Sequence, residues 1–295
     1  MKIIVTGSLG HISKPLTAAL VQKGYAVTVI SSNPQKQKDI EALGATGAFG
    51  SLDDVDFLTA TFTGADAVYT MVPPANYFDH DLDLTAYCHR IGNNYAVAIG
   101  ASGVKRVVHL SSIGAHLDKD SGIILAHHDV EIILSNLPGI AITFMRPTAF
   151  YYNLYGYVAM IKKHSFIAAN YGADNNIVWV SPIDIAAAVA EELETSFAGK
   201  KVRYVASEEL TGSQTAGILG AAIGRPDLKW ILISSDEMQS GLEAAGMQPR
   251  IAAGLVEMYA SLHNGALGED YYRNKPAVMG KVKLTDFAKE FAAAF

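Results

Sequence analysis

Thr6-Gly7-Ser8-Leu9-Gly10-His11-Ile12-Ser13 stands between an apolar run over residues 2–6 and a helical stretch over 14–23. A strand–turn–helix unit that binds a dinucleotide needs one glycine for the tight bend and a second where the backbone meets the pyrophosphate. It also needs a small residue where the helix packs on the strand. Gly7, Gly10 and Ser13 have this order. The N–H groups and partial positive charge at the helix start attract phosphates. An ordinary glycine turn is the alternative, but the position between strand and helix favours a dinucleotide site. Its predicted contacts are Thr6, Gly7, Ser8, Leu9, Gly10, His11 and Ile12.

The rest of the first half repeats this alternation. Six runs rich in β-branched residues predict strands at 2–6, 26–30, 46–49, 67–71, 104–111 and 141–146. Helical patterns separate them at 14–23, 35–43, 54–62, 79–102 and 121–136. Strand runs that are almost wholly apolar indicate burial on both faces, as in a parallel sheet. The pattern predicts an α/β fold with a doubly wound parallel (Rossmann) sheet.

The character of the chain changes near residue 150. Residues 151–157 are rich in tyrosine, and 170–176 form a polar turn cluster. Ser181-Pro182-Ile183-Asp184 has the N-cap serine, first-turn proline and first-turn acid of a helix start. We therefore expect a dinucleotide-binding domain over 1–150, rejoined by about 177–207. A smaller, discontinuous substrate lobe would consist of residues 151–176 and 208–295.

Composition limits the partners and the compartment. The chain has 295 residues, half of them apolar, and a formal charge of −6, so no excess of Lys and Arg favours direct binding to nucleic acid. No apolar run is long enough to cross a bilayer, and we expect no membrane contact. Cys88 is the single cysteine, which fits a reducing compartment and predicts a cytoplasmic protein with a small buried thiol. The histidines lack metal-ligand spacing, so no metal site is expected.

The end of the second predicted strand bears on the choice of cofactor. A site that prefers NAD has an acid there for the ribose 2′-hydroxyl. This chain has none and carries Ser32, Asn33 and Lys36 instead, which can donate to a 2′-phosphate. The sequence predicts NADP as the cofactor and leaves NAD open. A solvent-exposed helix lysine is the alternative reading of Lys36.

The chain resembles the NmrA-like proteins, which are atypical members of the short-chain dehydrogenase/reductase superfamily. Among them it looks most like the type 2 NADPH-dependent quinone oxidoreductases. The residues that carry the resemblance extend over nearly the whole chain: the turn 6–13, Ser32-Asn33-Pro34, Ser111-Ser112, Arg146-Pro147 with Tyr152-Asn153, and Ser181-Pro182-Ile183-Asp184. The resemblance implies an NADPH-binding oxidoreductase.

The carboxyl ends of parallel strands form the ligand-binding edge of such sheets. The sequence and the resemblance place four further cofactor contacts there: Val72, Pro73, Ser111 and Arg146. Pro74, Tyr151, Tyr152 and Asn153 are the candidate substrate contacts. The tyrosines could equally belong to a core between the lobes. Ser112 and His127 are the candidate catalytic residues.

One departure from the superfamily bears on the chemistry. Its catalytic pair is a Tyr followed four residues later by a Lys, and here Ile123 and His127 stand at those positions. Reduction of an ordinary carbonyl needs a fixed acid, whereas a quinone spreads the incoming charge over its ring and oxygens. The sequence therefore predicts hydride transfer from NADPH to a quinone or similar conjugated carbonyl, with positioning as the main contribution of the protein. The alternative is a non-catalytic redox sensor that binds NADP or NAD and acts through a protein partner. Oligomer formation stays open.

Overall fold

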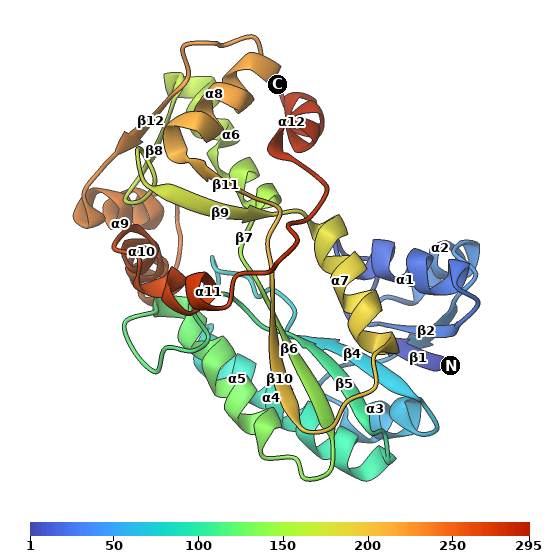
Figure 1. Ribbon diagram of the computed structural model, residues 1–295. Coiled ribbons are helices and arrows are strands. Elements are labelled where there is room, and N and C mark those ends of the chain that lie inside the picture. The colour runs from blue at the N-terminus through green and yellow to red at the C-terminus, as the bar shows by residue number, and fades with distance from the viewer.

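The computed structural model describes residues 1–295. Its central sheet has seven parallel strands in the order β10-β6-β5-β4-β1-β2-β3 (Figure 1). Their bounds are β1 Lys2–Val5, β2 Ala26–Ser31, β3 Thr46–Phe49, β4 Ala67–Met71, β5 Arg106–Leu110, β6 Ala141–Pro147 and β10 Lys200–Val205. The reversal of strand order at β1 and β4 makes the sheet doubly wound, so the predicted fold class is confirmed.

Helices cover both faces of this sheet (Figure 1). One face packs on α1 (Ser13–Gln22) and α7 (Pro182–Glu194), and the other on α3 (Val55–Phe62), α4 (Leu84–Ser102) and α5 (Leu125–Ser135). Successive strand residues point to opposite faces, so Val108 joins the first core and Val107 the second. This double burial explains the continuous apolar runs of the sequence.

Most element boundaries in the first half lie within two residues of those predicted from the sequence. The largest difference is at α4, which begins at Leu84 and not near residue 79. Asp83 caps this helix, since its Oδ1 accepts from Ala86 N at 2.9 Å. Asp79 forms a separate turn just before it, with its Oδ1 accepting from Asp81 N at 3.0 Å. Two aspartate turns in succession delay the helix start.

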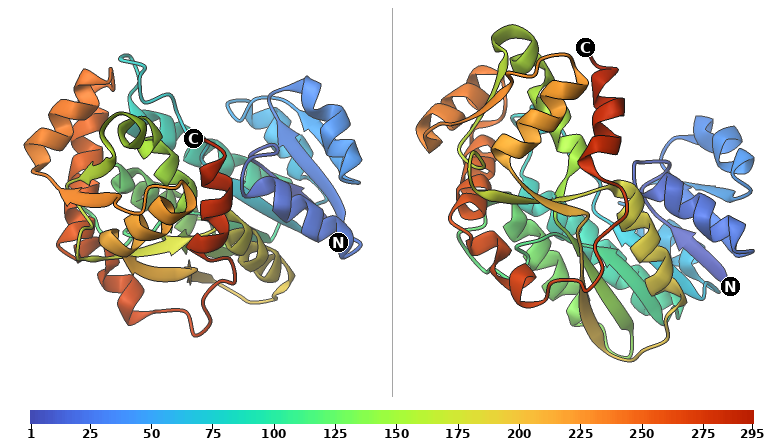
Figure 2. Two further views of the ribbon diagram at one scale, coloured as in Figure 1. Left: turned by 90° about the horizontal axis from the view of Figure 1, so that it is seen from above. Right: turned by 45° about the horizontal axis from the view of Figure 1, so that its top comes forward.

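The second lobe contains two small sheets and most of the remaining helices (Figure 2). The strands pair in the orders β11-β9-β7 and β12-β8. Their bounds are β7 Ala149–Phe150, β8 Phe166–Ala169, β9 Asn176–Val180, β11 Glu208–Thr211 and β12 Lys229–Leu232. The helices are α6 Val158–His164, α8 Gly212–Ala222, α9 Ser235–Ala244, α10 Pro249–His263, α11 Glu269–Arg273 and α12 Leu284–Ala292. Short elements complete the chain: η1 Pro34–Lys36, α2 Gln37–Ala42, η2 Gly122–Ile124, η3 Tyr151–Tyr157 and η4 Ala266–Gly268.

Residues 177–207, which the sequence predicts to rejoin the first domain, divide between the lobes. Strand β9 pairs with β11 and β7 and so belongs to the three-stranded sheet, whereas α7 and β10 return to the central sheet. Asp184 in the first turn of α7 joins the parts together. Its carboxylate accepts from Ser207 Oγ at 2.6 Å and from the backbone N–H groups of Lys281 and Val282. The segment from α11 to α12 is therefore attached to the start of α7 (Figure 1).

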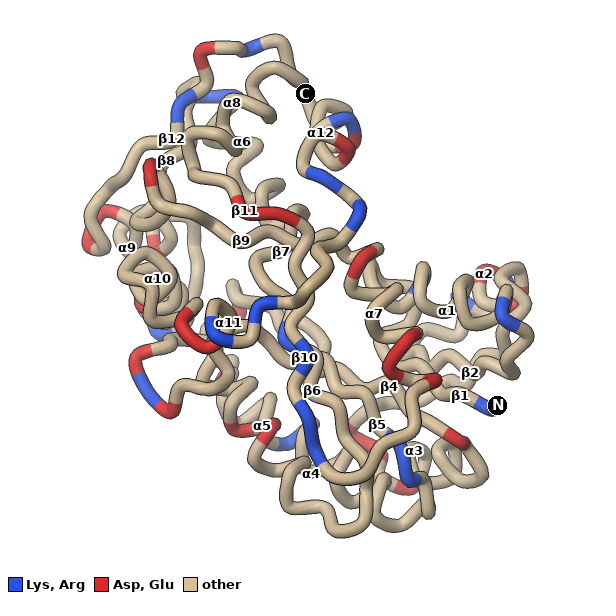
Figure 3. Tube along the Cα trace, viewed as in Figure 1, with Lys and Arg blue, Asp and Glu red and all other residues tan.

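Charged residues of both signs are interspersed along the chain in both lobes (Figure 3). No helix is both long enough and apolar enough to span a membrane. Cys88 is buried in the α4 face of the sheet core, and burial raises the pKa of its thiol to about 11. The interpretation of Cys88 as a small buried apolar residue is confirmed.

Candidate active site

The glycine turn joins β1 to α1 in the geometry that the sequence predicts. Gly7 has φ +86° and Ser8 has φ +54°, both in the left-handed region that favours glycine. A Cβ on Gly7 would lie 2.7 Å from Ser13 Oγ, which itself donates to Thr6 O at 2.8 Å. Gly10 N donates to Gly7 O at 3.1 Å and closes the turn. Gly7 is thus required both by its backbone angle and by the close packing of helix on strand.

The turn leaves donors free at the carboxyl end of the sheet. The backbone N–H groups of Leu9, His11 and Ile12 form no hydrogen bond inside the protein. Pro15 occupies the third position of α1, where a backbone N–H has no intrahelical acceptor, so it does not disturb the helix. These free N–H groups and the helix start fit a pyrophosphate.

The end of β2 lies beside the turn. Ser8 Oγ donates to Ser31 Oγ at 2.9 Å, and Asn33 N donates to the same oxygen at 3.1 Å. Asn33 Oδ1 caps η1, which leaves its amide donors free. Lys36 is exposed and pairs with Asp39 at 3.3 Å, while Ser32 is exposed. Asn33 and Ser32 present free donors here, whereas Lys36 has to exchange its partner in order to bind a phosphate.

Two phenols from α4 hold the end of β4. Tyr95 OH donates to Met71 O at 2.8 Å and Tyr87 OH donates to Pro73 O at 3.1 Å. Val72 and Pro73 are half-buried, and the next residue, Pro74, is exposed. The chain then enters a loop that leads to α4.

The two serines after β5 differ. Ser111 is buried and donates to Glu131 Oε1 at 2.5 Å, so its hydroxyl hydrogen is engaged inside the protein. Ser112 is half-buried and its hydroxyl contacts no other protein group within hydrogen-bond distance. Of the pair, Ser112 has the free donor.

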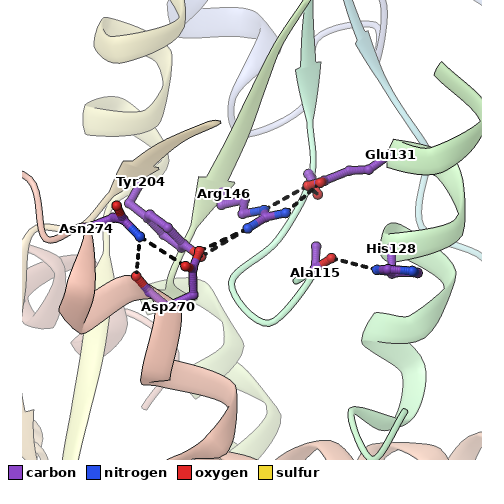
Figure 4. A network of polar contacts seen from close by, with 8 residues as sticks. Ala115, His128, Glu131, Arg146, Tyr204, Asp270 and Asn274 are labelled. Atoms are coloured by element: carbon purple, nitrogen blue, oxygen red, sulfur yellow. Dashed lines mark hydrogen bonds and ion pairs between the residues drawn. The ribbon is translucent and has the colours of Figure 1, made fainter. Parts of the chain in front are cut away.

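Arg146 lies in an internal ion network (Figure 4). Its Nε and Nη2 donate to the two carboxylate oxygens of Glu131 at 2.9 and 2.6 Å, and its Nη1 donates to Asp270 at 3.1 Å and to Tyr204 OH at 3.2 Å. Burial alone would lower the pKa of Arg146, but bonding to Glu131 more than offsets this and raises it. The sequence predicts Arg146 as a cofactor contact. In the structure the guanidinium is buried and binds three internal partners, as a buried charge requires, and its contact with the cofactor stays a prediction.

The neighbouring histidines of α5 face different surroundings. His128 Nδ1 bonds to Ala115 O at 3.0 Å, in the loop after β5 (Figure 4). His127 stands four residues before Glu131 and shares its helix face, which is directed at Ser111. Its Nδ1 is buried without a partner, and burial lowers the pKa of His127 to about 4. His127 is therefore a neutral imidazole at physiological pH.

The three residues after β7 point in different directions. Tyr151 is fully buried in the second lobe, where its ring stacks on Trp179 and its hydroxyl donates to Glu208 at 2.6 Å. The prediction of Tyr151 as a substrate contact is therefore wrong, and the alternative of a core residue holds for it. Tyr152 instead stacks on His11 of the glycine turn, with ring centroids 4.8 Å apart. Asn153 is exposed.

Several polar residues near the carboxyl edge of the sheet were not predicted from the sequence. His109 is fully buried in β5, with Nδ1 2.9 Å from Thr70 Oγ1 and Nε2 without a partner. A histidine among the apolar residues of 107–110 is the one signal that could have revealed it. Tyr77 and Gln248 come from loops of different lobes and meet at Tyr77 O.

Other features of the surface do not add to this site. A groove of about 640 Å³ lies between β10 and the segment after α11, lined in part by Arg203, Tyr204 and Asp270. These side chains bind one another or nearby acids, so they offer little to a ligand. No group of three or more His, Cys, Asp or Glu side chains could hold a metal ion.

Comparison with known proteins identifies the family to which this chain belongs. The sequence profile of the NmrA-like family matches residues 1–260. The chain belongs to the NmrA-like family. The NAD(P)H azoreductase of Xenophilus azovorans is 26% identical over 99% of each chain. A (4-alkanoyl-5-oxo-2,5-dihydrofuran-3-yl)methyl phosphate reductase of Streptomyces griseus is 24% identical over 90% of this chain and 88% of the relative.

Solved structures share the fold of this NmrA-like chain. The NADPH complex of an NADPH-dependent quinone oxidoreductase from Escherichia coli aligns with a TM-score of 0.81 and 21% identity, over 98% of this chain and 99% of that one. The triphenylmethane reductase of Citrobacter sp. in complex with NADP(H) aligns with a TM-score of 0.75 and 19% identity, over 98% and 99% of the two chains.

In this NmrA-like protein Ile123 stands where the short-chain dehydrogenases/reductases have their catalytic tyrosine, and here it is part of a packing contact. Ile123 lies in η2, which packs closely against α10. A Cβ on Gly254 would lie 3.0 Å from Ile123 Cγ2, and one on Gly122 would overlap Gly254 O. The apolar side chain and the pair of glycines bring η2 and α10 together. The site therefore lacks a phenol at this position, and the half-buried Ser112 keeps a free hydroxyl beside Ser111.

Proposed function

We propose that the protein is an NAD(P)H-dependent oxidoreductase that reduces a quinone or a similar flat, conjugated acceptor. The observation that carries the proposal is the glycine turn, whose free N–H groups at Leu9, His11 and Ile12 stand beside an aromatic ring, Tyr152, at the edge of the sheet. The azoreductase relative, similar over its whole length, supports it.

Different residues bind the cofactor and orient the acceptor. Free N–H groups of the turn bind the pyrophosphate, and donors at Ser32 and Asn33 favour a 2′-phosphate, since no acid follows β2. NADPH supplies a hydride when bound. Tyr152 offers the acceptor a flat apolar face, and burial, with the nearby Tyr77, raises the pKa of its phenol to about 12, so it stays neutral. A weakly basic product anion needs only a weak donor, a role that suits Ser112 or neutral His127.

The test is NADPH oxidation by the purified protein with menadione, an azo dye and a triphenylmethane dye, together with fluorescence titration of NADPH and NADH. We expect turnover with at least one acceptor and tighter binding of NADPH than of NADH. Tight NADPH binding without turnover of any acceptor would contradict the enzyme proposal and favour a redox sensor. Equal affinity for the two cofactors would show that the donors after β2 do not select NADP.

A further inference from the structure

Gln248 connects the two lobes at the rim of the site. It stands just before α10 of the second lobe and is buried. Its backbone N–H donates to Tyr77 O at 3.0 Å and its side-chain Nε2 donates to Leu82 O at 3.2 Å, both in the loop between β4 and α4. Its Oε1 accepts from Ile251 N at 3.0 Å and caps α10. One side chain thus caps a helix of one lobe and binds a loop of the other.

The loop over residues 72–83 depends on this contact. It contains no helix or strand. The phenols of α4 fix its beginning at Met71 and Pro73, and Asp83 caps α4 at its end. Between these points the loop has some turns of its own. Its hydrogen bonds to the rest of the protein there are the two from Gln248 and one between His80 Nε2 and Gly246 O at 3.3 Å. The second lobe therefore holds the middle of the loop in place.

Tyr77 is the side chain that the loop brings to the site. It is half-buried. Burial, and to a smaller extent the nearby Cys88, raises the pKa of its phenol, so the side chain stays uncharged. It lies close enough to Tyr152 and Tyr259 to add to the rise in their pKa values. Tyr152 in turn stacks on His11 of the glycine turn.

We propose that Gln248 is a positioning residue that holds the β4–α4 loop closed, so that Tyr77 and Tyr152 together form the wall of the acceptor site. The inference rests on the proposed reductase function. The pyrophosphate contacts belong to the glycine turn, and the predicted cofactor contacts Val72 and Pro73 lie at the start of the loop, which Tyr95 and Tyr87 hold independently of Gln248. Loss of the Gln248 contact should therefore weaken binding of the acceptor and leave the cofactor in place.

The variant Gln248→Asn separates the two roles of the side chain. Asparagine is a favoured N-cap residue and retains the α10 cap, but it is one methylene shorter and does not reach Leu82 O. Ser234→Ala is the matched control, because it removes the cap of α9 in the same lobe, where Ser234 Oγ accepts from Glu237 N at 3.2 Å, without touching the loop.

Two measurements are made on each variant: steady-state kinetics with menadione, and chymotrypsin cleavage after Tyr77 or Phe78, identified by mass spectrometry. For Gln248→Asn we expect the acceptor KM to rise roughly three- to tenfold, as for loss of one neutral hydrogen bond. We also expect faster cleavage in the loop and unchanged NADPH affinity. Ser234→Ala should leave the loop cleavage and the acceptor KM at wild-type values.

If Gln248→Asn shows the same loop cleavage and the same kinetics as the wild type, the positioning role is overturned and Gln248 is only a helix cap. Equal changes in Gln248→Asn and Ser234→Ala would overturn it as well, by showing a general effect of lobe stability. If the wild-type protein oxidises no NADPH with any acceptor, the proposed function fails by itself. The cleavage comparison then still decides whether Gln248 closes the loop.

Discussion

At the scale of single residues, the glycine turn offers a test that separates backbone strain from crowding. Gly7 and Gly24 both have positive φ, at +86° and +81°, but a Cβ on Gly24 has no neighbour within 4 Å, while one on Gly7 meets Ser13 Oγ. Gly24→Ala should reduce the free energy of unfolding by about 1–2 kcal/mol, the usual cost of a left-handed alanine. Gly7→Ala should cost more and weaken NADPH binding roughly tenfold or more, because it displaces the turn.

Urea denaturation and fluorescence titration of NADPH measure the two effects. Gly24→Ala is the control for the strain of positive φ alone, and it should bind NADPH as the wild type does. A Gly7→Ala variant with wild-type NADPH affinity would show that the turn does not hold the cofactor.

The two histidines of α5 form a second matched pair. His127 shares a helix face with Glu131, whereas His128 bonds to Ala115 O. His127→Ala should lower turnover or NADPH affinity roughly tenfold, the effect of losing about one hydrogen bond at the site. His128→Ala should chiefly lower stability, by roughly 1 kcal/mol, because it releases the loop after β5. Steady-state kinetics and thermal unfolding of both variants give the comparison, and equal, negligible kinetic effects would remove His127 from the site.

At the scale of secondary-structure elements, one ion network joins four of them. Arg146 on β6 binds Glu131 on α5 and Asp270 on α11, and Tyr204 on β10 donates to the same aspartate (Figure 4). Arg146→Met should destabilise the protein by about 3–5 kcal/mol, because it leaves a buried carboxylate without its partner. The double variant Glu131→Gln/Arg146→Met should recover much of this, since glutamine is neutral and still accepts from Ser111.

Urea denaturation measures these stabilities, and NADPH titration of the double variant tests whether Arg146 also contacts the cofactor. We expect wild-type affinity in the double variant. An Arg146→Met protein of normal stability that binds NADPH weakly would instead return this residue to the cofactor site.

The elements also show how far the sequence determines the fold and the site. Apolar runs and glycine turns are local signals, and they predict the parallel strands of the first half with their order of helices. Arg146 has no such signal for its role, because Asp270 lies 124 residues away in the chain. Tyr151 and Tyr152 are adjacent and chemically alike, and only the packing of η3 sends one into the lobe core and the other onto His11. Side-chain direction at the lobe boundary depends on contacts that periodicity does not encode.

At the scale of the whole molecule, buried histidines should make the fold sensitive to mild acid. Burial lowers the pKa of His109 to about 3 and that of His127 to about 4, and it lowers the pKa of His116 as well. In the unfolded chain these groups titrate near pH 6.5. Below that pH the unfolded state binds protons that the native state does not, so stability falls as the pH falls.

His109 and His127 should each remove about 1.4 kcal/mol per pH unit from the free energy of unfolding, between about pH 6 and the lowered pKa of each group. Glu192 acts later. Burial alone would raise the pKa of its carboxyl, but Lys201 and Arg203 more than offset this and lower it, so the group stays ionised through most of this window. Urea denaturation at pH values from about 7 to about 5 measures the slope.

His109→Gln can keep a contact with Thr70 and does not titrate, so it should reduce the slope by about one histidine's share. A His109→Gln variant with the wild-type slope would mean that His109 takes up its proton without unfolding, and that the polar groups around Thr70 accommodate the charge.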